Sequence, residues 1–259
     1  MNKLLKYIKS HKKEIYIIVS LVVIALISYI IYKMNSKKLK KSNYRIGICT
    51  WYNDGIKEYA DIARDINQKY CDLHGYDFIV DNVRRLPDRN YAWECITAVL
   101  NVLNTNKYDY VMWIDADAFF RLENENVNLL DEIINKNIGK DFIFSNDVPG
   151  FDIINLGVFI VKNNDYTKNI LQTMIDSTDE RCKLYKDWPA EQGCMVHTYK
   201  TEIKNKGVIL PVGDIQSWGN IHYVNNDEIF KRSLILHLAG SSHEERIEIM
   251  TKFKKDYGL

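Results

Sequence analysis

The stretch Tyr108-Asp-Tyr-Val-Met-Trp-Ile-Asp-Ala-Asp-Ala118 decides how this chain folds. Its first seven residues are mostly aromatic and β-branched and are too few for a stable helix, which predicts a buried central strand. Asp115 then opens a turn, and Asp117 follows two residues later. Because successive residues of an extended chain point to opposite sides, Asp115 and Asp117 can share one side. The stretch therefore predicts two carboxylates at the C-terminal end of a central strand.

Two carboxylates at such a position suit a hard divalent cation such as Mg²⁺ or Mn²⁺. The C-terminal ends of strands are also where open α/β sheets bind their ligands. A divalent ion there can bridge a diphosphate and stabilise a departing nucleoside diphosphate as a Lewis acid. An Asp-x-Asp pair also occurs in many solvated turns, so other residues must decide between these interpretations.

Around this strand, strand-like and helix-like patterns alternate, which predicts an α/β layer architecture. The last predicted helix opens at Ser242 with a capping box, and Pro189 suits the first turn of the helix before it. Strands are predicted over residues 44–51, 76–80, 108–114, 141–145, 156–161, 208–210 and 234–238, and helices over 55–74, 91–103, 165–177 and 189–199.

The N-terminus divides into a basic tail at 1–14, an uncharged run at 15–32 and a basic linker at 33–42, before a domain at 43–259. The run of 18 residues would extend ~27 Å as a helix, close to the ~30 Å core of a bilayer. We therefore predict a transmembrane helix at 15–32 that contacts the lipid bilayer, with a cleaved signal peptide as the alternative. Both flanks are basic, so charge alone does not orient this helix.

Composition sets further limits. Of the 259 residues, 46% are hydrophobic and 27% charged, which is enough for a packed core. The net charge of +1 argues against a general nucleic-acid binder. Five cysteines without a CxxC spacing exclude a zinc ribbon and define no disulfide framework. If the domain is lumenal, a pair such as Cys182 and Cys194 can form a bridge.

Six motifs in order resemble glycosyltransferase family 34, which groups α-galactosyl-, α-mannosyl- and xyloglucan α-xylosyltransferases. They are Tyr70-Cys-Asp-Leu-His-Gly-Tyr-Asp-Phe78, Trp93, residues 108–118, Asn155-Leu-Gly-Val-Phe159, Glu191-Gln192 and His237-Leu-Ala-Gly240. The resemblance implies a GT-A fold, in which a Rossmann-like nucleotide-binding half joins an acceptor half. It also implies a retaining reaction and a type II protein of Golgi- or ER-type membranes with a lumenal catalytic domain. Homo- or hetero-oligomers are also implied, since family members often work in complexes.

The resemblance places Asp115 and Asp117 on the metal and makes His237 the third ligand. A histidine at a strand end is otherwise often structural. Two carboxylates with one imidazole fit Mn²⁺ better than Mg²⁺, which stays as the alternative.

The resemblance also assigns donor contacts near the ends of the strands. The nucleotide base would lie against Thr50, Trp51 and Tyr52, although Trp51 can equally pack the sheet edge. The diphosphate and sugar would contact Asp115, Ala116, Asn155, Gly157 and Gly240. Asp147 and Asp152 lie in the preceding loop, where they either bind sugar or acceptor hydroxyls or belong to an ordinary solvated loop.

Glu191 and Gln192 match the family positions near the anomeric carbon. A double displacement needs a nucleophile there, and the amide of Gln192 is a poor one. We therefore favour a front-face reaction in which the leaving diphosphate deprotonates the acceptor, Gln192 stabilises the anomeric centre and Glu191 orients the sugar. Cys95 replaces a lysine that is common in the family, so the positive charge for the phosphates would come from His243, Arg84, Arg85, Arg89 or Arg246.

These observations predict a retaining hexosyl- or pentosyltransferase that uses a UDP-sugar or GDP-mannose donor and a glycan acceptor. Two alternatives stay open: a GT-A enzyme of another family, and a weak or inactive membrane-tethered module that binds sugar nucleotides or glycans.

Overall fold

The structure, a computed structural model, describes residues 11–35, 42–124, 128–147, 153–176, 180–183, 185–187 and 189–259. The chain divides into two compact units, Met1–Leu39 and Lys40–Leu259. In the first unit the described residues form one helix, α2 (Lys12–Asn35). Within the described residues, no helix has both the length and the apolar character that crossing a membrane requires, so the span predicted over 15–32 is not found.

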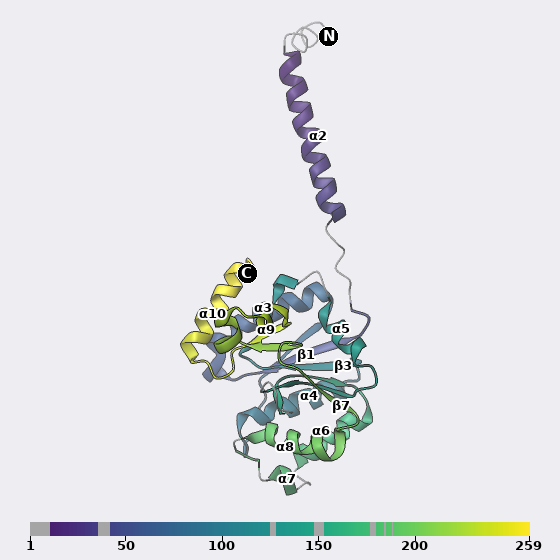
Figure 1. The fold of residues 1–259 in the computed structure, drawn as a ribbon, viewed down its shortest axis with the longest axis vertical. Coiled ribbons are helices and arrows are strands. Elements are labelled where there is room, and N and C mark those ends of the chain that lie inside the picture. The colour runs from purple at the N-terminus through teal and green to yellow at the C-terminus, as the bar shows by residue number, and fades with distance from the viewer. Residues whose placement is uncertain are drawn as a thin grey trace. The chain divides into compact units, whose positions relative to one another are not determined.

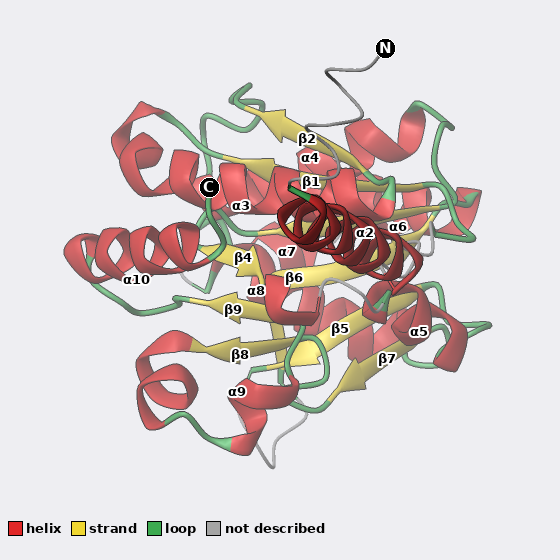
Figure 2. Ribbon diagram, turned by 90° about the horizontal axis from the view of Figure 1, so that it is seen from above, coloured by secondary structure: helices red, strands yellow, loops and turns green. Residues whose placement is uncertain are grey.

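The second unit is built on a six-stranded mixed sheet with the order β2-β1-β3-β6-β5-β7 (Figure 2). Strand β6 runs antiparallel to both of its neighbours, and the other pairs are parallel. Every residue of β3 is buried, as expected for a strand covered on both faces. The strands are β1 (Ile46–Trp51), β2 (Asp77–Asp81), β3 (Tyr110–Ile114), β5 (Phe142–Asn146), β6 (Ile154–Lys162) and β7 (Gly207–Leu210).

A second sheet of three short strands adjoins the first, with the order β4-β9-β8. It consists of β4 (Ala118–Phe120), β9 (Ile235–His237) and β8 (Gln216–Trp218). Strand β4 begins directly after the Asp115–Asp117 turn and pairs antiparallel with β9, so that Ala118 lies opposite His237. This pairing brings the end of a late strand next to the two carboxylates.

Helices cover both faces of the large sheet (Figure 1). One face packs on α3 (Lys57–His74) and α10 (His243–Asp256), and the other on α4 (Glu94–Asn104), α6 (Asp165–Asp176) and α8 (Ala190–Thr198). In the first core the Tyr70 and Phe120 rings stack with centroids 3.8 Å apart, and in the second Trp93 is fully buried. The remaining α-helices are α5 (Leu129–Lys136), α7 (Glu180–Lys183) and α9 (Glu228–Arg232).

Local sequence signals begin and end helices at the positions that the sequence predicts. Ser242 and Glu245 form the capping box at the start of α10, and Gly75 ends α3 in the left-handed region with a φ of 76°.

Cys182 and Cys194 form a disulfide, which confirms the bridge anticipated for that pair. The bridge joins α7 to α8, the helix that carries Glu191 and Gln192.

Candidate active site and metal centre

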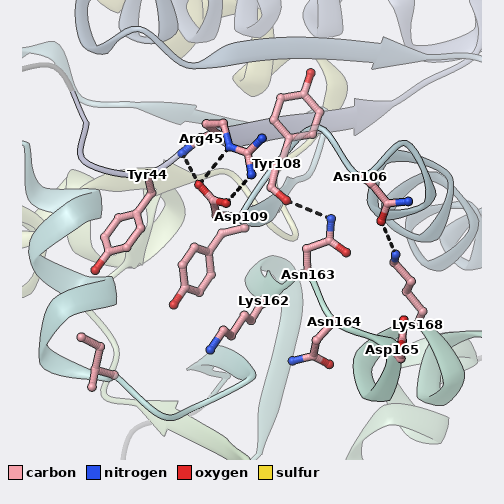
Figure 3. Close-up of a pocket in the computed structure, with 12 residues that line it drawn as sticks. Tyr44, Arg45, Asn106, Tyr108, Asp109, Lys162, Asn163, Asn164, Asp165 and Lys168 are labelled. Carbon is pink, nitrogen blue, oxygen red and sulfur yellow. Dashed lines mark hydrogen bonds and ion pairs between the residues drawn. The ribbon is translucent and has the colours of Figure 1, made fainter.

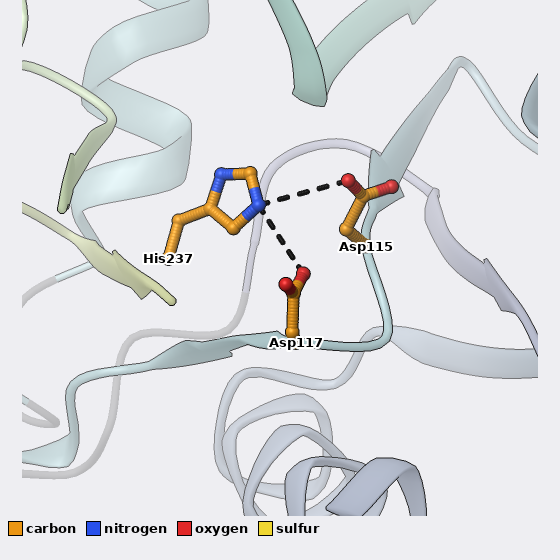
Figure 4. Close-up of side chains that lie close together, drawn as sticks. All are labelled: Asp115, Asp117 and His237. Carbon is orange, nitrogen blue, oxygen red and sulfur yellow. Dashed lines mark ion pairs between the residues drawn. The ribbon is translucent and has the colours of Figure 1, made fainter. Parts of the chain in front are cut away.

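Three side chains from distant parts of the sequence converge at the end of β3 (Figure 4). His237 Nε2 lies 3.6 Å from Asp115 Oδ2 and 3.2 Å from Asp117 Oδ1. One potential ligand atom of each residue lies within 4.8 Å of the others, and the described part of the chain holds no second such group of His, Cys, Asp or Glu. Neighbouring ligands of an octahedral ion are spaced about 3 Å apart, so the three atoms fit a single cation.

The turn that carries the carboxylates is held by backbone bonds. The Asp115 N–H donates to the carbonyl of Gly157 at 2.8 Å, and the Ala118 N–H donates to the carbonyl of Asp115 at 3.0 Å. The Trp113 indole N–H donates to Asp115 Oδ1 at 2.8 Å, which fixes that side chain and leaves Oδ2 toward His237.

Gly157 leaves the space that the histidine needs. A Cβ atom on Gly157 would lie 2.1 Å from His237 Cε1 and 2.9 Å from Asp115 Oδ2. These separations are far below van der Waals contact, so only glycine permits the imidazole and the carboxylate to meet here.

A buried chain of amides decides how His237 is protonated. The backbone N–H of Gly157 can only donate, and it lies 2.8 Å from Asn155 Oδ1, which identifies that atom as the oxygen. Gln216 Nε2 donates to the same oxygen at 2.9 Å, so Gln216 must turn its own oxygen to His237 Nδ1, also at 2.9 Å.

His237 Nδ1 must therefore carry a proton and donate it to Gln216, since Gln216 Oε1 can only accept. In the neutral imidazole the lone pair then lies on Nε2, the atom that faces Asp115 and Asp117. Metal-bound histidines typically donate their other ring N–H in this way, which fixes both tautomer and ring orientation. The residues present thus fit a divalent metal ion.

The charged groups of this centre shift one another's pKa values. Burial raises the pKa of Asp115, and the neighbouring Asp117 carboxylate acts in the same direction. Burial also opposes ionisation of Asp117, but His237 and Arg246 outweigh it and lower the pKa of Asp117. Burial opposes protonation of His237, yet Asp117 and then Asp115 raise the pKa of its imidazole. A bound cation would relieve the repulsion between the two acids.

A cavity of about 220 Å³ opens beside the carboxylates. The rings of Trp51 and Tyr91 stack there with centroids 5.8 Å apart, and the indole N–H of Trp51 is held by the carbonyl of Val83. Glu191 reaches the same cavity with its Oε2 buried and without a hydrogen-bond partner, and burial raises the pKa of Glu191 to about 8. A buried carboxyl oxygen without a partner calls for an explanation, and a polar ligand in the adjoining cavity is one.

Several predicted site residues line this cavity, namely Trp51, Asp115, Ala116, Asp117 and Glu191. Tyr52 does not, because its side chain is buried in the core and its hydroxyl donates to Asp61 at 2.9 Å. Thr50 is buried within β1.

The remaining predicted residues lie around the amide chain. Asn155 and Gly157 belong to that chain, and Asp147 accepts a hydrogen bond from Asn155 Nδ2 at 2.7 Å. Gln192 Oε1 accepts the N–H of Leu156 at 3.2 Å, which ties α8 to β6. Gly240 adopts a positive φ of 76°, and Asp152 lies outside the described residues.

Sequence reasoning missed Gln216, Tyr59 and Tyr91. Gln216 belongs to a three-residue strand with no recognisable period, so nothing in the local sequence marks it. Tyr59 and Tyr91 line the cavity. They were missed because both lie near the start of a predicted helix, where an aromatic residue is more often part of the core.

A larger cavity, about 670 Å³, lies at the opposite end of these strands, where β1 and β3 begin and β6 ends (Figure 3). Its lining includes the ion pair of Arg45 with Asp109, 2.6 Å apart, and the free end of Lys162. Among the residues that the structure describes, its lining includes no cluster of three side chains that could hold a metal ion. The smaller cavity beside Asp115 and Asp117 is therefore the candidate active site.

Comparison with known families matches residues 45–248 to the galactosyl transferase GMA12/MNN10 family, Glyco_transf_34. The chain belongs to this family. It is therefore a glycosyltransferase, as the motifs of the sequence indicate. No curated protein sequence matches the chain.

Two solved structures resemble the fold. One is a glycosyltransferase involved in glycosylation of the major capsid of PBCV-1, with a TM-score of 0.63, 18% identity, and coverage of 80% of this chain and 99% of that one. The other is the galactosyltransferase LgtC in complex with donor and acceptor sugar analogues, with a TM-score of 0.53, 12% identity, and coverage of 81% and 95%. Both are glycosyltransferases, and the mixed sheet of this family member is thus of the GT-A type.

Replacing Gln216 by Leu removes the acceptor that holds His237 Nδ1. We expect the affinity of the candidate site for a divalent cation, tested with Mn²⁺, to fall by about 10- to 100-fold, the usual cost of losing a partner of a metal-bound histidine. Electron paramagnetic resonance of free Mn²⁺ measures the affinity directly. Gln172→Leu on the exposed face of α6 is the matched control. Equal affinities in Gln216→Leu and in the control would show that the amide chain does not orient the imidazole.

Glu191 should make stability depend on pH. Its folded pKa of about 8 lies above the ordinary 4.5, so the folded state holds the proton more tightly. Its stabilising contribution is therefore complete below pH 4.5 and is lost as the pH rises to about 8. Glu191→Gln should match the wild type near pH 4 and exceed it in stability near pH 8, by a few kcal/mol at most. Urea unfolding at both pH values tests this, with Glu248→Gln as an exposed control; a difference that is constant with pH would contradict it.

Proposed function

We propose that this glycosyltransferase moves a hexose or pentose from a nucleotide-sugar donor, a UDP-sugar or GDP-mannose, to a glycan acceptor. The observation that carries the proposal is the convergence of Asp115, Asp117 and the Nε2 lone pair of His237 beside a cavity. Such a centre suits a diphosphate held through a divalent cation.

Asp115, Asp117 and His237 would hold the cation. We propose Mn²⁺ rather than Mg²⁺, because Mg²⁺ favours shells made only of oxygen and this centre includes an imidazole. When bound, the ion supplies Lewis-acid stabilisation of the departing nucleoside diphosphate. Trp113 fixes the side chain of Asp115, and Gln216 fixes that of His237. These two hydrogen bonds preorganise the metal ligands before the donor binds.

The cavity walls suggest how the donor is oriented. The stacked Trp51 and Tyr91 rings offer an aromatic surface for the base, and Ala116 leaves room between the two carboxylates. Glu191, with its pKa raised to about 8, is largely protonated at neutral pH and can donate a hydrogen bond to a sugar hydroxyl. Asp147, held by Asn155 at 2.7 Å, and Asp152 are proposed to contact the sugar or the acceptor.

We propose that the anomeric configuration is retained through a front-face reaction. A double displacement needs an ionised nucleophile near the anomeric carbon, and a protonated Glu191 is a poor one. The leaving diphosphate then takes the proton of the acceptor hydroxyl, and Gln192, whose Oε1 accepts the Leu156 N–H at 3.2 Å, is proposed to stabilise the anomeric centre.

We propose a type II membrane protein of Golgi- or ER-type membranes with a lumenal catalytic domain. The Cys182–Cys194 disulfide supports the lumenal placement of the domain, since disulfides persist in oxidising compartments. Protein in intact microsomes should resist alkaline carbonate extraction and should be cut by added protease only after detergent treatment. Release by carbonate, or cleavage of the domain without detergent, would reject this placement. Assembly into homo- or hetero-oligomers stays a prediction of the family resemblance.

Removing one metal ligand tests the function. Asp117→Ala should abolish Mn²⁺-dependent turnover, by about 100-fold or more, because a metal ligand supports several kcal/mol of transition-state stabilisation. It should also weaken donor binding. The assay is release of nucleoside diphosphate from a panel of UDP- and GDP-sugars, with and without Mn²⁺. Asp256→Ala, exposed at the end of α10, is the matched control. Unchanged turnover in Asp117→Ala would reject the metal centre, and no release by the wild type from any donor would favour a binding module.

A further inference from the structure

The acidic pair has a protein cation bound to it. Arg246, in the first turn of α10, places Nη2 2.8 Å and Nε 3.0 Å from Asp117 Oδ2. The other oxygen of Asp117 lies 3.2 Å from His237 Nε2. One ligand of the metal centre is therefore shared between an imidazole and a guanidinium.

Arg246 also borders the donor cavity. Its guanidinium carbon lies 5.2 Å from the ring centroid of Tyr59, and Tyr59 lines the cavity together with Asp115 and Asp117. The Arg246 side chain is 20% exposed, so the guanidinium is partly shielded from water but can still reach a ligand.

The other basic residues that the sequence offers for phosphate binding have partners other than Asp115 and Asp117, although Arg84 also stacks on Tyr91 of the cavity at 4.1 Å. Arg85 pairs with Asp81 at 2.7 Å, Arg84 lies 3.3 Å from Glu94, and His243 lies 3.2 Å from Glu58. Arg89 donates to the carbonyls of residues 174 and 175. Of the five candidates for phosphate binding in the sequence, Arg246 is the one that lies against the acidic pair.

We propose, building on the function above, that Arg246 competes with the divalent ion for Asp117 and, on leaving that carboxylate, binds the diphosphate of the donor. Arg246 would thus exchange one anionic partner for another. It supplies the phosphate-binding cation that Cys95 cannot supply.

The physical basis is charge balance. A guanidinium and a divalent ion repel each other when they share one carboxylate, so binding of the ion weakens the hold on Arg246. A diphosphate between them removes this repulsion and accepts the paired N–H donors of the guanidinium. Metal and nucleoside diphosphate should therefore bind with positive coupling, and Arg246 should be part of that coupling.

Arg246→Gln should shift two affinities in opposite directions. Without the competing cation, Mn²⁺ alone should bind about three- to ten-fold more tightly. In saturating Mn²⁺, UDP and GDP should bind about ten-fold or more weakly, because the phosphate contact is lost. Paramagnetic resonance of Mn²⁺ and calorimetric titration of the two nucleotides measure these affinities without turnover.

Two further variants separate the proposal from general damage. Lys255→Gln removes the same charge from an exposed position on the same helix and should leave both affinities unchanged. Arg246→Lys keeps the charge but loses the paired donors, so it should show the same two shifts with smaller size. It also provides the test if Arg246→Gln fails to fold, as judged by its thermal unfolding.

A purely structural role predicts a different result. If Arg246 only holds Asp117 in place, both Mn²⁺ and nucleotide would bind more weakly in the variants, and that outcome overturns the proposal. Unchanged nucleotide affinity in Arg246→Gln and Arg246→Lys also overturns it. If wild-type protein shows no Mn²⁺-dependent binding of either nucleotide, the proposed function itself fails.

Discussion

The hydrogen bond from His237 Nδ1 to Gln216, 2.9 Å long and fully buried, is the constraint on which the site depends. It turns the lone pair of the imidazole toward two carboxylates, and it is itself directed by the backbone N–H of Gly157 through Asn155. Because a backbone N–H cannot exchange its role as a donor, every amide in this chain has only one orientation. A metal-binding geometry is thus set by the sheet backbone before any ligand arrives.

This constraint requires two sheets to meet. Strand β4 follows the turn that carries Asp115 and Asp117, and it pairs with β9. Strand β8, which carries Gln216, pairs with β9 on its other side. Gly157 on β6 closes the arrangement, since any side chain there would occupy the position of the imidazole. The site therefore lies where the C-terminal end of β3 in the large mixed sheet meets the three-stranded sheet. The disulfide between α7 and α8 fixes the helix that brings Glu191 to the same cavity.

Charge explains how the proposed anionic donor would be bound. Two carboxylates at close range favour a cation, and the protein offers His237 and Arg246 as partial partners for Asp117. A divalent ion and a diphosphate together balance these charges better than either does alone. Glu191 differs from this pair because burial has the largest effect on its carboxyl group. Burial raises the pKa of Glu191 and leaves it a hydrogen-bond donor at neutral pH.

Much of the fold follows from the sequence alone. The apolar run before Asp115, the capping box at Ser242 and the glycine after His74 are local signals, and each depends only on residues within one element. The strands at 118–120 and 216–218 escaped prediction because three residues carry no period and pair only with distant partners. The prediction that Tyr52 contacts the nucleotide base was wrong. Successive side chains of a strand point to opposite sides, so Tyr52 points away from Trp51 and into the core, where its hydroxyl donates a hydrogen bond to Asp61.

The sequence by itself determined which residues have metal-ligand chemistry. Only the tertiary structure decided which nitrogen of His237 faces them and that Arg246 contacts Asp117, since these contacts join residues 21 to 129 positions apart.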